Sequence, residues 1–149
     1  MVGSVALLAT LALGLAAGAV LAEGAVLVPW WRSLPPEAFL TWYAANASRL
    51  FWFFGTLEMV SAALVVAAAL LVRSRLFVAA ALLTAGVLAV FPLYFQGVNA
   101  GFEAATIAPA DVAAELGRWA RWHWLRTGMA IAAFAAAVVG FAARRRPDN

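Results

Sequence analysis

The sequence has no cysteine and no lysine, it has a single histidine, and only 11% of its residues are charged. Without cysteine there is no disulfide bond, no thiolate metal site and no cysteine nucleophile. The single histidine, His123, excludes a haem held by two histidine ligands. So few charged side chains leave too little polar surface to cover a soluble globule of 149 residues. The composition therefore excludes a soluble globular domain.

The sequence instead has long apolar runs, with 66% hydrophobic residues and a mean hydropathy of +0.94. A helix that crosses a bilayer needs about 20 apolar residues, so 149 residues allow one domain of about four spans. We predict an all-α integral membrane four-helix bundle, with amphipathic extensions before the second and fourth spans. The predicted single domain is 1–149, and its spans are residues 4–28, 50–72, 76–96 and 122–143.

Prolines and polar residues predict where these helices begin, end or bend. Pro29 is expected to close the first helix, and Arg73–Arg75 to form a short turn between antiparallel spans. Pro92 is expected to kink the third span and to free the carbonyl of Leu88, with a loop following Phe95. The helix that leads into the fourth span is expected to be capped by Asp111.

The ten basic residues are all arginine, and the net charge is +3. Juxtamembrane arginines anchor and orient membrane spans, so the high pI of 10.6 does not indicate nucleic-acid binding, and membrane lipid is the expected partner. Arg73, Arg75 and Arg144–Arg146 predict that both termini are cytoplasmic, in a bacterial inner membrane. The other arginines equal them in number, but Arg126 and Arg49 are expected inside the bundle and so do not count as loop charges.

One stripe of the last helix is unusual. Small residues in its lower half allow close helix approach, while its upper half has His123 and Arg126, which we expect to point into the bundle. Bulky residues on the other faces are expected to contact lipid: Leu125, Ile131, Phe134, Val138 and Phe141. Steps of four and three residues form the stripe itself: Trp119, His123, Arg126, Ala130, Ala133, Ala137 and Gly140.

With this topology, Glu23, Glu58, His123 and Arg126 all lie in the outer leaflet. A charged residue in hydrocarbon costs about 2.5–3.5 kcal/mol on insertion scales, so each of these groups needs a partner or a wet cavity. We expect Arg126 to pair with Glu23 or Glu58. Two carboxylates with one arginine leave a surplus carboxylate, which would be neutral or would bind a proton, a cation or a metal.

Several interpretations of this cluster remain open. It could be an ion-pair lock that fixes helix register in a structural or accessory protein. Glu23, Glu58 and His123 could hold iron, manganese or zinc, although no ExxH or HxxxH pair supports a metal and Arg126 competes for the carboxylates. A small proton-coupled exporter could use Glu23, but this residue lies near the membrane edge and transporter sites lie at the midplane. His123 itself is either a hydrogen-bonded core histidine or a general acid or base.

Aromatic residues gather at the same depth. They are packing residues by default, but an outer-leaflet cavity with aromatic walls and a few polar groups is typical of a pocket for a lipophilic ring. Partners are therefore a lipophilic small molecule and lipid, and small-residue stripes on the first helix also allow a homo-oligomer. The candidate ligand-binding residues are Trp119, Trp122, Asn99, Phe54 and Tyr94.

The segment RWARWHWLRTGMAIAAFAAA resembles the C-terminal signature of the DUF1772 family of anthrone-oxygenase-like membrane proteins. A Gly-rich first span, VPWWRSLPPEAFLTWYAAN after it and the Asn of QGVNAGF agree in order. The resemblance implies a four-helix membrane bundle and, as in fungal relatives, oxygenation of anthrone-type polyketides to anthraquinones without an evident metal or flavin. It further implies His123 or a carboxylate, Glu23 or Glu58, as the base, and Arg126 as the group that stabilises the anion.

Overall fold

The computed structural model describes residues 2–144, so Arg145 and Arg146 of the basic tail lie outside the described residues. Within the described residues the fold consists of four helical rods, and each is long and apolar enough to span a membrane. The predicted all-α four-helix bundle is therefore confirmed, and it indicates an integral membrane protein. The rods are α1 (Val2–Ala22), η1 (Glu23–Leu27) and α2 (Val28–Ser33); α3 (Pro36–Val72); α4 (Arg75–Val90), η2 (Phe91–Phe95) and α5 (Gln96–Glu103); and α6 (Pro109–Ala143).

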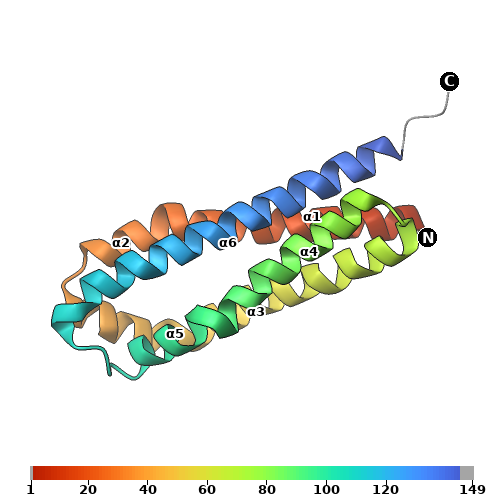
Figure 1. Ribbon diagram of the computed structural model, residues 1–149. Coiled ribbons are helices and arrows are strands. Elements are labelled where there is room, and N and C mark those ends of the chain that lie inside the picture. Colours follow the sequence, from red (N-terminus) through yellow and green to blue (C-terminus); the bar gives the residue numbers. More distant parts are fainter. Residues whose placement is uncertain (1, 145–149) are drawn as a thin grey trace.

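The rods alternate in direction. Figure 1 shows the start of α1, the end of α6 and the α3–α4 turn at one end of the bundle, which we call the end with the termini, and the α2–α3 and α5–α6 connections at the other end. Helix α1 packs against α3 and α6, and α4 packs against the same two helices. The turn between α3 and α4 is as short as expected: Arg73 adopts a left-handed conformation with φ 55°. Ser74 then caps α4, because its hydroxyl accepts a hydrogen bond from the Leu76 N–H at 3.3 Å.

The prediction that Pro29 closes the first helix is wrong. The rod continues to Ser33 because a wide π-helical turn, η1, precedes the proline. In that turn the Val28 N–H donates to the carbonyl of Glu23, five residues earlier. Pro29 then stands in the first turn of α2, where a missing N–H costs nothing.

Pro92 is accommodated in the same way. The Phe91 N–H donates to the Leu88 carbonyl, so the acceptor that we expected to be free is occupied. Pro92 itself lies in a second π-helical turn, η2, and the Gln96 N–H bonds to the Phe91 carbonyl five residues back. The helix then resumes as α5 and runs to Glu103, so the predicted loop after Phe95 is wrong.

The predicted cap of α6 is also wrong. The helix begins at Pro109, its N-cap residue is Ala108, and no side chain caps it. Proline suits this first position because its ring already has a helical φ and needs no N–H partner. Asp111 lies in the first turn, where its negative charge interacts favourably with the positive end of the helix dipole. From there α6 runs without interruption into the stripe, as predicted.

The bundle has a different core at each end. Near the α5–α6 connection the core is aromatic, and at the end with the termini it consists mainly of alanine, valine and leucine. All seven residues of the α6 stripe are buried, which confirms that they face the bundle. Phe134 and Phe141, expected against lipid, are half-buried and pack on the alanine-rich core instead. The ring of Phe134 fits there because Gly14 has no side chain: a Cβ at Gly14 would lie 2.9 Å from Phe134 Cε2.

Candidate functional site

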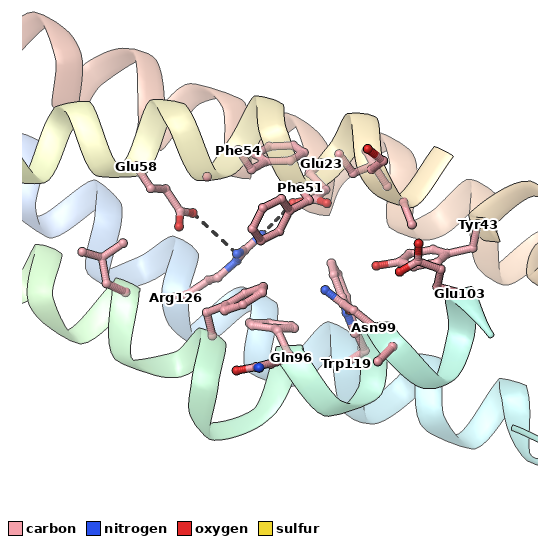
Figure 2. A pocket seen from close by; sticks show the side chains of 18 of the residues that line it. Glu23, Tyr43, Phe51, Phe54, Glu58, Gln96, Asn99, Glu103, Trp119 and Arg126 are labelled. Atoms are coloured by element: carbon pink, nitrogen blue, oxygen red, sulfur yellow. Dashed lines mark hydrogen bonds and ion pairs between the residues drawn. The ribbon is translucent and has the colours of Figure 1, made fainter. Parts of the chain in front are cut away.

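An arginine from α6 meets two glutamates from other rods. Arg126 Nη2 donates to Glu23 Oε2 at 2.8 Å, and Arg126 Nη1 lies 3.5 Å from Glu58 Oε1 (Figure 2). All three side chains are buried. Arg126 therefore pairs with both carboxylates, where the sequence allowed either. The guanidinium also lies 4.7 Å from the ring centroid of Phe95, which covers it as a cation–π partner.

His123 is sealed inside the bundle with no exposed surface. Its Nε2 is 2.8 Å from the Val20 carbonyl, and its Nδ1 is 3.2 Å from Arg126 Nε. A carbonyl only accepts and a guanidinium only donates, so Nε2 carries the proton, Nδ1 accepts and the imidazole is neutral. The ring stacks on Trp119, with centroids 4.9 Å apart and 10° between the planes. His123 is thus a hydrogen-bonded core histidine that positions Arg126.

A cavity of about 580 Å³ lies beside this cluster, between α3 and the third rod (Figure 2). Six aromatic side chains form much of its wall, and its exposed lining residues belong to α3 and α5, so its mouth lies between these helices. The volume is in the range of drug-sized ligand sites. Its lining includes Glu23, Tyr43, Phe51, Phe54, Gly55, Glu58, Phe91, Phe95, Gln96, Asn99, Glu103, Trp119 and Arg126.

Polar groups reach this cavity with unused hydrogen-bonding capacity. Trp119 Nε1 donates to Asn99 Oδ1 at 3.0 Å, which leaves the amide nitrogen of Asn99 unbonded. Within residues 2–144 the hydroxyl of Tyr43 has no hydrogen-bond partner, and the Glu58 carboxylate accepts no hydrogen bond. The cavity therefore offers donors and acceptors to a bound molecule.

The structure brings only some of the predicted residues to the cavity. Trp119, Asn99, Phe54, Glu23, Glu58 and Arg126 line it, whereas His123 does not. Tyr94 and Trp122 also lie outside its lining: their rings stack on each other at 5.3 Å, and the Tyr94 hydroxyl donates to Glu115 Oε1 at 2.7 Å.

One face of α3 lines the cavity and was not predicted to do so. Tyr43, Phe51 and Gly55 were not proposed as site residues. A signal was present, because residues 43, 47, 51, 54 and 58 follow each other at steps of four and three and so share one face of a helix. This stripe ends in the charged residue Glu58, and the α6 stripe likewise includes the charged residue Arg126.

The geometry bears on two of the open interpretations, the metal site and the ion-pair lock. Across residues 2–144, no three side chains of the metal-ligating types are placed to hold a metal ion, and both nitrogens of His123 are engaged in hydrogen bonds. A simple ion-pair lock predicts mutual bonding of all three charged groups and no cavity. The cavity is present, and Glu58 is held only by an ion pair.

The chain was also compared with known proteins. No family model matches it, and no curated protein or solved structure is detectably similar to it.

Proposed function

We propose that the protein binds a lipophilic aromatic molecule, anthrone-like or quinone-like, in the cavity between α3 and α5. The observation that supports this most directly is the combination of aromatic walls with an ionic cluster at one side of about 580 Å³ of space. Flat rings stack well on aromatic side chains, and a few polar groups fix their orientation. Because the mouth lies between α3 and the α5 part of the third rod, and both rods are of membrane length, such a ligand would enter from the lipid phase.

The resemblance to anthrone-oxygenase-like proteins supports oxidation as the candidate reaction. Glu58 would act as the base. It lines the cavity, which His123 does not, and it accepts no hydrogen bond, whereas Glu23 accepts one from Arg126. It would remove a proton from an acidic ring CH₂ group, and Arg126 would stabilise the anion. The carbanion would reduce O₂ to a hydroperoxide on that carbon, and loss of water would leave a carbonyl group. CH₂ and O₂ are thereby converted to C=O and H₂O.

Filling the cavity tests this proposal. Gly55 lines the cavity, and a Cβ placed on it would meet no atom within 4 Å, so Gly55→Phe inserts a ring into the ligand space. Gly97→Phe is a matched control, because Gly97 also has open space around its Cβ, lies in α5 and does not line the cavity. Anthrone binding to protein in nanodiscs is measured by quenching of tryptophan fluorescence, with empty nanodiscs as background.

We expect Gly55→Phe to lose anthrone binding, while Gly97→Phe should bind anthrone like wild type. Oxygen uptake with anthrone, measured on the same samples, tests the oxidation step separately. Binding that is equal in all three proteins would place the ligand elsewhere and refute the proposal. Binding without oxygen uptake would leave a binding protein and refute the enzyme.

We also propose that the termini face the cytoplasm of a bacterial inner membrane. Arg126 is 6% exposed and belongs to the bundle, so it does not count as a loop charge. Arg49 is exposed, so the expectation that it lies inside the bundle is wrong, and it counts as a loop charge. The end with the termini then has five arginines in the sequence and the opposite end four, and positive charge favours the cytoplasmic side.

A further inference from the structure

We infer that the cavity selects a ligand with a hydrogen-bond donor on one edge and an acceptor on the opposite edge, through Glu58 and Asn99. This inference rests on the proposed function and adds the polarity of the ligand to it. Figure 2 shows Glu58 at one end of the cavity and Asn99 and Tyr43 toward the other end, with aromatic rings between them.

The Glu58 end presents carboxylate oxygens and, when both glutamates are ionised, surplus negative charge. Arg126 is the only cation that contacts the buried carboxylates in residues 2–144, and its short hydrogen bond goes to Glu23. His123 adds no charge because its two hydrogen bonds require the neutral ring. Two carboxylates and one guanidinium give a net charge of −1 when both glutamates are ionised.

The carboxylate of Glu58 is also short of hydrogen bonds. The residue is 9% exposed, and none of its oxygens accepts a hydrogen bond within the described chain. A buried acceptor without a donor is costly, so a ligand that donates a hydrogen bond there is favoured. This end therefore fits a hydroxyl or an amine of the ligand.

The Asn99 end has the opposite polarity, and a neighbouring indole sets it. Trp119 Nε1 only donates, so the Asn99 atom that it contacts at 3.0 Å is the amide oxygen. The NH₂ group of Asn99 must then be the free one, and it has two donors for the cavity. An oxo group on the ligand would accept from it.

Three naphthalene probes separate the two ends. 6-Hydroxy-2-acetonaphthone has a donor and an acceptor on opposite edges, 6-methoxy-2-acetonaphthone lacks the donor, and 2-naphthol lacks the acceptor. In nanodiscs we expect wild type to bind the hydroxy ketone about tenfold more tightly than the methoxy ketone, as a hydrogen bond to a charged group predicts. Glu58→Leu should abolish this preference, and Glu58→Gln, which keeps a neutral acceptor, should reduce it.

Asn99→Asp tests the other end without disturbing Trp119, because the carboxylate still accepts the indole N–H. Wild type should bind the hydroxy ketone more tightly than 2-naphthol, which lacks the acceptor. Asn99→Asp removes the NH₂ donors, so this advantage should disappear. Equal wild-type binding of the hydroxy and methoxy ketones, or a preference that survives both Glu58 variants, would overturn the inference while leaving the proposed function intact. If no probe binds above empty nanodiscs, or if Gly55→Phe leaves binding unchanged, the proposed function fails and the inference with it.

Discussion

A β-carbon on Gly24 would lie 2.9 Å from both Cδ2 and Nε2 of His123. The first rod therefore approaches α6 so closely that only a glycine fits opposite the imidazole. Gly24 belongs to η1, so the same π-helical turn that lets the helix pass Pro29 also presents Glu23 and Gly24 to the ionic cluster. The site thus depends on an irregular turn in the first rod.

Gly24→Ala is expected to destabilise the protein. The imidazole has no free space to move into, because it stacks on Trp119 and both its nitrogens are bonded. Overpacking of this kind costs about 1–3 kcal/mol of unfolding free energy. Gly18→Ala in α1 is the control: its Cβ would meet no atom within 4 Å, so helix propensity alone should leave it neutral or slightly stabilising. Thermal unfolding in detergent compares the two, and a loss in Gly18→Ala equal to that in Gly24→Ala would contradict the close contact.

The two glutamates should differ in their effect on stability. Glu23→Gln removes the charge that accepts a hydrogen bond from Arg126 at 2.8 Å, and we expect a loss of about 1–3 kcal/mol. Glu58→Gln removes the surplus carboxylate and leaves the Glu23–Arg126 pair intact, so the unfolding free energy should stay the same or rise. The measurement is denaturant unfolding of both variants side by side. The opposite order would mean that Glu58 is the principal partner of Arg126.

The fold was predictable because its signals are long and periodic. Apolar runs set the four rods, and the steps of four and three residues along α6 identified seven residues that are all buried. The helix ends were less predictable. Pro29 predicted a helix end and Pro92 a kink, but each is accommodated by a π-helical turn, and such turns are too rare to be expected from a sequence pattern.

The candidate site was predictable in its charges and not in its shape. That Glu23, Glu58 and Arg126 meet follows from the cost of isolated charges in lipid. The sequence does not specify whether His123 or Arg126 faces the cavity, because the two residues are three positions apart and their side chains leave the helix at neighbouring angles. One lines the cavity and the other is sealed against Val20, and this difference arises from the tertiary packing of α1 and α6.

His123→Phe is expected to destabilise the bundle although it preserves a stacked aromatic ring. The phenyl ring cannot accept from Arg126 Nε, so a buried charged donor loses its partner. The expected cost is about 1–3 kcal/mol of unfolding free energy. Trp124→Phe is a suitable control, because Trp124 is exposed and touches the imidazole only edge-on, at 6.4 Å between centroids. If His123→Phe unfolds at the same temperature as Trp124→Phe, the hydrogen bond to Arg126 contributes nothing.

The orientation of the chain can be tested with single cysteines, since the natural sequence contains none. Thr106 is exposed in the connection between α5 and α6, and Ser74 lies in the turn between α3 and α4 at the opposite end. Because the arginines favour the Ser74 end as cytoplasmic, an impermeant maleimide should label Thr106→Cys in right-side-out bacterial spheroplasts. Ser74→Cys should be labelled only after the membrane is permeabilised. The reverse pattern would place the termini outside and would put the cavity in the cytoplasmic leaflet, where a ligand must first cross the membrane to reach it.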